Sequence, residues 1–141
     1  MSEWRELHRG VVHPWFCDQF GHMNVRYYAH FFDDAAFHIW PAHDIGWKRM
    51  EALGVHTVVA RTTTEFLAEL KAGDLITVRA AFTRLGTKSI TYALTMHNVE
   101  TDELHARQEG VEVFFDPKTR LGVAIPDEIR TELSGLVVSA E

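Results

Sequence analysis

The chain has 141 residues, which suits one domain with its own core, so we expect a single domain over residues 1–141. A formal net charge of −6 argues against a nucleic-acid partner, because phosphate contacts need clustered lysine and arginine. One cysteine excludes a disulfide within the chain, and the charged first residues do not resemble a signal peptide. No apolar run reaches membrane-spanning length. These features predict a cytoplasmic, soluble protein without a membrane partner.

The first third of the chain is expected to form an edge strand and then a long helix. The strand covers residues 7–15, and Pro14 closes it. The helix is expected over residues 25–40, where apolar residues recur three and four apart, and Asn24 suits the N-cap position. Pro41 is expected to end this helix, since the residue before a proline avoids helical geometry. Few positions of the helix are polar, so we expect other elements to cover most of its sides.

The remainder of the chain predicts four more strands and two short helices. The first short helix falls within 43–54, the strands cover residues 56–70, 75–84, 89–97 and 104–115, and the second short helix opens at 126–130. In the last strand, Val111, Val113 and Phe115 share one face. One strand, one helix and a four-strand meander indicate an α+β domain with an antiparallel sheet. The edges of such a sheet need cover, which favours a homodimer.

Asp18 lies in a loop that leads directly into the expected helix start at Val25. A helix N-terminus presents unpaired backbone N–H groups and the positive end of the helix dipole. A carboxylate beside such a site suits acyl transfer, because one group attacks or activates water while the other stabilises the oxyanion. From the residues alone, an Asx turn in which Asp18 caps its own loop explains the spacing at least as well.

A longer run around this aspartate resembles the active-site segment of hotdog-fold thioesterases, in the branch of 4-hydroxybenzoyl-CoA thioesterase. The run is Asp18-Gln19-Phe20-Gly21-His22-Met23-Asn24-Val25-Arg26-Tyr27, and the likeness continues through Lys71-Ala72-Gly73-Asp74 and Leu85-Gly86-Thr87-Lys88-Ser89. It implies a hotdog fold, in which an antiparallel five-stranded sheet wraps around one long apolar helix, assembled as a homodimer or homotetramer. The residues from Gly21 to Val25 are also similar to betainyl-CoA thioesterases.

The resemblance implies that the protein hydrolyses an acyl-CoA thioester to a carboxylic acid and free CoA. It implies no cofactor and no metal, since coenzyme A enters only as part of the substrate. Asp18 would be the nucleophile or the general base, and the N–H of Val25 the oxyanion donor. His22 and Asn24 are candidates for orienting water or the thioester carbonyl, with loop support and N-capping as their alternatives. Tyr27 is expected to pack at a subunit boundary or to contact substrate.

Candidates for the CoA phosphates lie around the turn at Gly86. Arg84, Lys88 and Ser89 offer two cations and a hydroxyl, which suit a phosphate. The resemblance does not fix these contacts, because they vary among hotdog branches. A solvated basic turn is therefore the alternative interpretation of these residues.

Two other functions are open alongside hydrolysis. One is a hotdog dehydratase or hydratase acting on acyl thioesters, but its usual pattern of a histidine plus an acid is not placed here. The other is a non-catalytic acyl-CoA-binding protein, which would not require Asp18, Gly21 and Asn24 together. Asp33 and Asp34 are alternative catalytic acids, because another hotdog branch uses a helix carboxylate. Here both belong to a polar stripe of the helix, and this explains them without catalysis.

Overall fold

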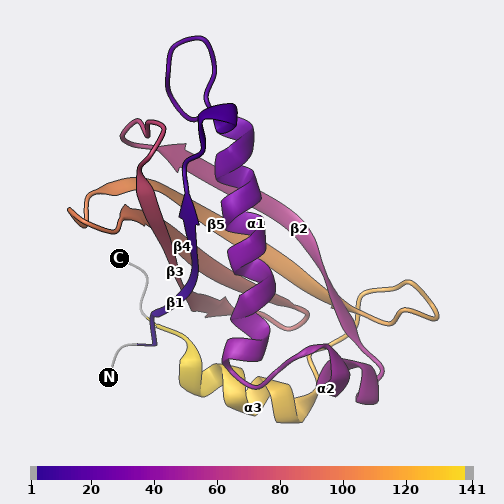
Figure 1. Ribbon diagram of the computed structural model, residues 1–141. Coiled ribbons are helices and arrows are strands. Elements are labelled where there is room, and N and C mark those ends of the chain that lie inside the picture. Colours follow the sequence, from indigo (N-terminus) through magenta and orange to yellow (C-terminus); the bar gives the residue numbers. More distant parts are fainter. Residues whose placement is uncertain (1–2, 139–141) are drawn as a thin grey trace.

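Residues 3–138, the part of the chain that this computed structural model describes, form one antiparallel sheet with three α-helices and a short 3-10 helix (Figure 1). In chain order the elements are β1 (Arg5–Val11), η1 (Pro14–Phe16), α1 (Val25–Ala42), α2 (Trp47–Ala52), β2 (His56–Phe66), β3 (Leu75–Leu85), β4 (Ser89–Asn98), β5 (Leu104–Phe115) and α3 (Asp127–Leu136). The element types therefore follow the order expected from the sequence. Among the helices of these residues, none is long and apolar enough to cross a membrane.

The strands lie in the order β1-β3-β4-β5-β2, and every neighbouring pair is antiparallel. The meander of β3, β4 and β5 is confirmed. The expected pairing of β2 with β3 is wrong, because β2 pairs with β5 at the opposite edge of the sheet. The segment 67–74 is longer than a hairpin loop, and it carries the chain across the end of the sheet. As a result β2 is an edge strand that begins beside α2 and ends near the start of α1 (Figure 1).

The long helix α1 begins where the sequence predicts and ends two residues later than expected. The Asn24 side chain accepts a hydrogen bond from the Arg26 N–H at 3.2 Å, so this residue is the N-cap. Pro41 does not stop the helix but lies in its last turn. A proline there removes only one N–H, and its fixed φ is itself helical. The N–H of His43 then bonds to carbonyl oxygens of the last turn and closes α1 at Ala42.

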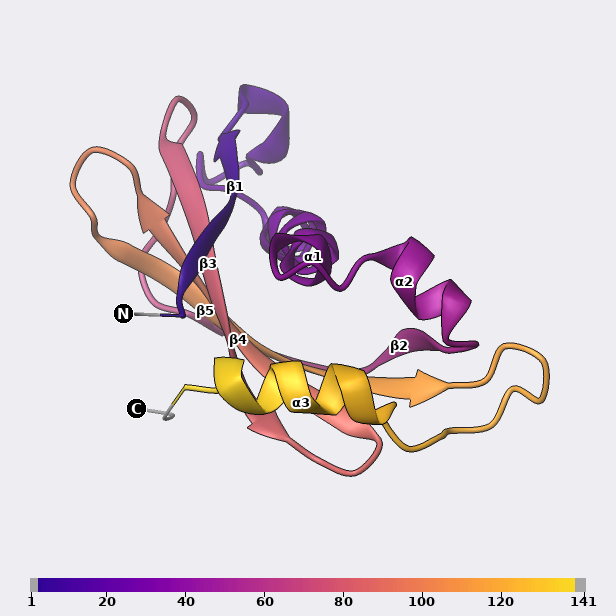
Figure 2. The same ribbon diagram turned by 90° about the horizontal axis from the view of Figure 1, so that it is seen from below.

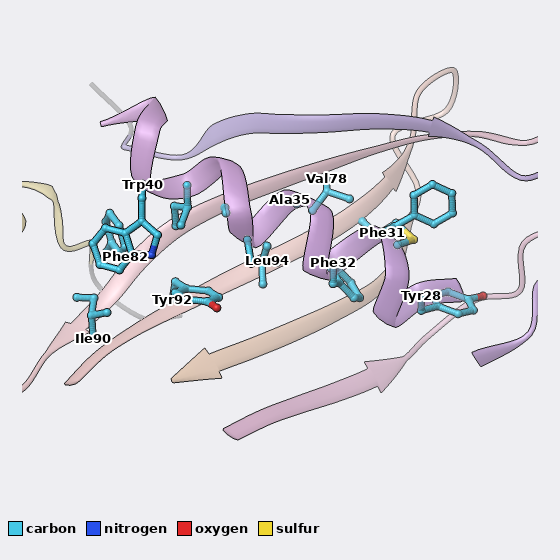
Figure 3. Packing of buried hydrophobic residues seen from close by; sticks show 14 of the residues in the cluster. Tyr28, Phe31, Phe32, Ala35, Trp40, Val78, Phe82, Ile90, Tyr92 and Leu94 are labelled. Carbon is cyan, nitrogen blue, oxygen red and sulfur yellow. The ribbon is translucent and has the colours of Figure 1, made fainter. Parts of the chain in front are cut away.

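One face of α1 packs on the sheet and supplies much of the core. Figure 2 shows α1 end-on beside the sheet, with α3 lying across one end of the sheet. The buried side chains of α1 are Tyr28, Phe31, Phe32, Ala35, Ala36, Ile39 and Trp40. Figure 3 shows several of them packed against residues of β3 and β4, including Phe82, Ile90, Tyr92 and Leu94. Within one chain the rest of α1 is less covered than expected, because Val25 and Phe37 of this helix are 60% and 56% exposed.

The buried face of β5 is not the valine-rich one. Val111, Val113 and Phe115 are only partly buried, whereas the opposite face, which includes Gly110 and Glu112, is buried. A Cβ atom at residue 110 would lie 2.5 Å from a ring carbon of Tyr92, so only glycine admits this ring across the strand. The core of this protein therefore contains the carboxyl group of Glu112, which the alternating valines of β5 did not predict.

Candidate active site

The loop between η1 and α1 is a tight turn that presents Asp18. Cys17 and Met23 form an isolated antiparallel bridge at its base. Within the turn, the Asp18 N–H bonds to the His22 carbonyl at 3.1 Å, and the Gly21 N–H bonds to the Asp18 carbonyl at 2.9 Å. Gly21 has φ of +79°, a conformation that residues with a Cβ rarely adopt. The backbone of the turn thus fixes the position of Asp18 at the start of α1.

The carboxylate of Asp18 has one oxygen committed to the loop and one near the helix cap. Its Oδ1 accepts the Phe20 N–H at 3.0 Å, which is the Asx turn that the sequence allowed. Its Oδ2 lies 3.4 Å from Asn24 Nδ2, a long and therefore weak hydrogen bond. The side chain is half-buried. The turn and a reactive role are therefore compatible, since one oxygen positions the group and the other is only loosely held.

The N-terminus of α1 keeps one backbone donor beside this loop. Asn24 caps the Arg26 N–H with its side chain, and its carbonyl accepts the Tyr27 N–H at 3.0 Å. Among the described residues, the Val25 N–H then has no acceptor. Such an N–H at the positive end of a helix is suited to binding a negative oxygen.

A cavity of about 370 Å³ opens at this end of α1. The residues that line it come from the loop, α1, β2 and the segment after β2: Asp18, Phe20, His22, Met23, Val25, Tyr28, Phe66 and Glu69. His22 Nε2 lies 3.1 Å from Glu69 Oε2, so the histidine ties the loop to the segment that crosses the sheet. Burial raises the pKa of Tyr28, which keeps its hydroxyl protonated at neutral pH. The predicted acid and oxyanion donor therefore share one cavity with two hydrogen-bonding side chains.

Two groups of predicted binding residues lie elsewhere in the chain. Tyr27 stacks on Phe16 with ring centres 4.4 Å apart and is not among the residues that line the cavity. Arg84, Lys88 and Ser89 lie at the turn between β3 and β4, where Arg130 donates to backbone carbonyls. This turn is at the far end of β3 from the Asp18 loop (Figure 1). Within one chain the structure therefore does not bring the basic turn to the carboxylate.

The alternative helix acids have other surroundings. Asp34 Oδ2 lies 3.7 Å from His30 Nε2 and 3.9 Å from His8 Nε2. Asp33 is exposed and lines a second cavity, farther along α1. Within residues 3–138, no three histidine, cysteine, aspartate or glutamate side chains are grouped as ligands for a metal ion.

The second cavity, also of about 370 Å³, lies between the C-terminal half of α1, α2 and the start of β2. Its lining is mainly aromatic and aliphatic: Asp33, Ala36, Phe37, Trp40, Trp47, Met50, Thr57, Val58, Val59 and Glu112. Only 5% of Glu112 is exposed. Sequence reasoning missed this residue; the signal available was an acid in step with Gln108 and Gly110 rather than with the valines of the same strand.

Three donors from three different elements converge on Glu112. Its Oε1 accepts from Trp40 Nε1 at 3.0 Å and from Thr57 Oγ1 at 2.7 Å, and its Oε2 accepts from the Tyr92 hydroxyl at 2.5 Å. Burial and this neighbouring carboxylate raise the pKa of Tyr92, so the phenol remains a donor. The network fixes the carboxylate against α1, β2 and β4 at once.

Comparison with known proteins assigns the chain to a family. The model of the thioesterase-like superfamily matches residues 12–133, which include the Asp18 loop, α1 and the strands β2 to β5. The chain belongs to this superfamily. The thioesterase is 26% identical over 132 residues to the chloroplastic acyl-acyl carrier protein thioesterase ATL3 of Arabidopsis thaliana, covering 94% of this chain and 68% of that protein.

Solved structures share the fold of the thioesterase. SAV2348 from Staphylococcus aureus, solved in complex with CoA, has a TM-score of 0.82 and 23% identity, with 97% of this chain and 89% of that chain covered. The 12:0-ACP thioesterase from Umbellularia californica has a TM-score of 0.84 and 16% identity, with 99% and 56% covered. Family membership makes the chain a thioester hydrolase, as the sequence predicted. The five-stranded antiparallel sheet with its helices agrees with the expected hotdog fold.

Proposed function

We propose that the thioesterase hydrolyses an acyl-CoA thioester to a carboxylic acid and free CoA, with Asp18 as the catalytic carboxylate and the Val25 N–H as the oxyanion donor. The observation that carries this proposal is that both groups line one cavity at the start of α1. Attack on a thioester carbonyl moves negative charge onto its oxygen, and a preorganised N–H at a helix N-terminus stabilises that charge.

Asp18 has two ways to use this arrangement. As a nucleophile, its carboxylate oxygen attacks the carbonyl carbon, CoA leaves as the thiolate, and water then hydrolyses the mixed anhydride. As a general base, it takes a proton from the water that attacks. His22 and Asn24 are positioning residues in both cases. His22 ties the loop to Glu69, and Asn24 links the carboxylate to the helix cap.

Coenzyme A as the carrier is supported by two features. The structural relative SAV2348 was solved in complex with CoA. The exposed basic residues Arg84 and Lys88 suit phosphates. Their turn is far from the Asp18 cavity of the same chain, so we propose that it reaches the cavity of a second copy. We also propose the branch of 4-hydroxybenzoyl-CoA thioesterase and a cytoplasmic site of action, where the single cysteine stays reduced.

Assembly as a homodimer or homotetramer through β2 is part of the same proposal. β2 is an edge strand of 11 residues with one side unpaired, and Val58, Val59 and Phe66 are each about half exposed. An unpaired strand edge with exposed apolar side chains invites pairing with another strand. Light scattering should therefore give two or four times the chain mass of 16.1 kDa. A folded monomer at micromolar concentration would contradict the pairing.

Release of free thiol from a panel of acyl-CoAs tests the activity, because only hydrolysis liberates CoA without a second substrate. A dehydratase or hydratase would instead convert hydroxyacyl-CoA and enoyl-CoA without releasing thiol. A single turnover in ¹⁸O-labelled water then tests the two roles of Asp18. A nucleophile whose anhydride is hydrolysed at the Asp18 carbonyl carbon gives an unlabelled first acid product and takes the label into its own carboxylate, whereas a general base gives a labelled product and stays unlabelled.

A further inference from the structure

One wall of the Asp18 cavity is made by the chain where it leaves β2. Phe66 ends β2, and both Phe66 and Glu69 line the cavity. The Glu69 carboxylate lies 3.1 Å from Nε2 of His22, which is in the Asp18 loop. Residues 67–70, here called the wall segment, belong to no helix or strand, so the regular ladder of a sheet does not hold them in place.

Leu70 joins the wall segment to the loop and to the helix. Its carbonyl accepts the Met23 N–H at 2.8 Å, and its backbone hydrogen-bonds the hydroxyl of Tyr28, which also lines the cavity. Leu70 is itself fully buried. A shift of the wall segment would therefore move the base of the Asp18 loop with it.

His105, the second residue of β5, holds the wall segment from the other side. Its carbonyl accepts the N–H groups of Leu67 and Ala68 at 2.9 and 3.1 Å. Its ring Nδ1 lies 3.1 Å from the Ala68 carbonyl oxygen, and because a carbonyl can only accept, Nδ1 carries the hydrogen of this bond. Only 3% of His105 is exposed. Its backbone and its ring together therefore bind both polar backbone groups of Ala68.

The ring of His105 contributes through Nδ1 and not through its other nitrogen. Nε2 is buried and has no hydrogen-bond partner among the described residues, since Glu103 Oε1 lies 3.4 Å away but is not aligned for a bond. A buried polar atom without a partner lowers stability, so an apolar side chain would be more favourable here if packing alone mattered. What an apolar side chain would lack is the donor for the Ala68 carbonyl.

We propose that His105 is a positioning residue of the catalytic site, whose Nδ1–H binds the Ala68 carbonyl and so keeps the wall of the Asp18 cavity in place. This inference rests on the proposed function of Asp18. Ala68 directly precedes Glu69, so the contact lies one residue from the side chain that meets the loop. The ring does not line the cavity, so it acts through the wall segment and not on the substrate. Small displacements of a catalytic group slow the chemical step.

Three substitutions at this position test the role of Nδ1. His105→Leu removes the donor, and we expect kcat for thiol release to fall about tenfold while KM changes by about twofold or less. His105→Asn should recover most of that loss, because the amide nitrogen of asparagine takes the place of Nδ1. His105→Gln should not, because its nitrogen takes the place of Nε2. An asparagine variant no faster than the glutamine variant would overturn the inference.

Gln108→Leu is the matched control for a loss that affects only the fold. Gln108 is also a buried residue of β5, and its Nε2 donates to Thr64 Oγ1 at 2.9 Å, within β2 and before the wall segment begins. Both leucine variants should unfold at a lower urea concentration than the wild type, but only His105→Leu should lower kcat. Equal losses of kcat in the two variants would mean that His105 supports the fold in general, and the inference would be wrong.

Hydrogen exchange separates this inference from the hydrolysis itself. The Met23 amide bonds to the Leu70 carbonyl, so its exchange rate, measured by NMR, reports whether the wall segment still holds the loop. This amide should exchange about tenfold faster in His105→Leu than in the wild type, and about twofold faster or less in Gln108→Leu. If that result is obtained but no acyl-CoA is hydrolysed, the proposed function is wrong and the placement of the wall by His105 stands. If acyl-CoA is hydrolysed but neither kcat nor Met23 exchange responds to His105→Leu, the positioning role is wrong.

Discussion

Asp18 and Glu112 each line one of the two cavities beside α1, and their carboxylates differ in burial and in the donors that hold them. Asp18 is on a loop, half-buried, with hydrogen bonds of 3.0 and 3.4 Å. Glu112 is in the middle of a strand, almost fully buried, with three donors at 2.5 to 3.0 Å. The two residues thus carry the same functional group, but that of Asp18 is loosely held and half-buried, whereas that of Glu112 is firmly held and buried.

The difference shows what each setting allows a carboxylate to do. A nucleophile or base must change its bonding partner during the reaction, so at least one oxygen has to be loosely held and reachable. A carboxylate whose oxygens are all held by buried donors is instead suited to a structural role, because none of its bonds has to change. We therefore propose a catalytic role for the loop carboxylate and a structural role for the strand carboxylate.

The largest effect is expected from removal of the loop charge. Asp18→Asn keeps the acceptor for the Phe20 N–H, so the turn should persist, while thiol release should fall by about two to four orders of magnitude. Asp34→Asn is the control, since that carboxylate lies beside His30 and His8. Near wild-type turnover by Asp18→Asn would move the chemistry to the helix acids.

Removal of the strand carboxylate should affect stability most. Glu112→Ala leaves the indole of Trp40 and the hydroxyls of Thr57 and Tyr92 without their acceptor, and we expect a loss of about 3–5 kcal/mol in the free energy of unfolding. Urea unfolding at a fixed protein concentration measures it. Glu109→Ala on the same strand should change it by about 0.5 kcal/mol or less. Equal effects of the two variants would show that Glu112 is not a structural acceptor.

A smaller change is expected at the residue that links the loop to the helix. Asn24→Ala removes the acceptor for the Arg26 N–H and should lower the free energy of unfolding by about 1 kcal/mol. Asn24→Ser restores a capping oxygen but is too short to reach Asp18. Thiol release by the serine variant therefore reports the Asn24–Asp18 contact alone. If Asn24→Ser is as unstable as Asn24→Ala, the cap is not what Asn24 contributes.

The smallest effect should come from the basic turn. Lys88→Ala and Arg84→Ala should each raise KM for acyl-CoA about two- to fivefold with kcat unchanged, because phosphate binding is the same in the ground state and the transition state. The effect should shrink as salt rises. An acyl thioester of N-acetylcysteamine, which lacks the nucleotide, is the control and should not respond. Unaltered KM in both variants at low salt would mean that the turn does not bind CoA.

Local signals predicted the parts of this protein that depend on neighbours in sequence. Asn24 before an apolar periodicity gave the start of α1, and the turn at Gly73, with φ of +94°, separates β2 from β3 as expected. The pairing of β2 with β5 is nonlocal. The sequence of β2 could not predict it, because either edge of an antiparallel sheet accepts the same alternating sequence. The prediction that Pro41 ends α1 was wrong, because a proline in the last turn disturbs little of a helix.

The candidate site divides in the same way. Asp18 and Val25 are seven residues apart, so a loop-helix motif was enough to bring them together. The Glu112 network joins Trp40, Thr57 and Tyr92 across 72, 55 and 20 residues, and no spacing rule connects them. In β5 the valines lie on the partly buried face. The usual assumption that apolar residues are the buried ones therefore predicted the wrong face and left Glu112 on the exposed one.

The close approach of Gly110 to Tyr92 has a consequence for engineering. The phenol crosses the strand where residue 110 has no side chain, and its hydroxyl then reaches the carboxylate two residues along. Gly110 does not line the cavity, yet even one added methyl group would displace the ring and release one of the three donors. A substitution at Gly110 should therefore disturb the Glu112 network from a position outside the cavity.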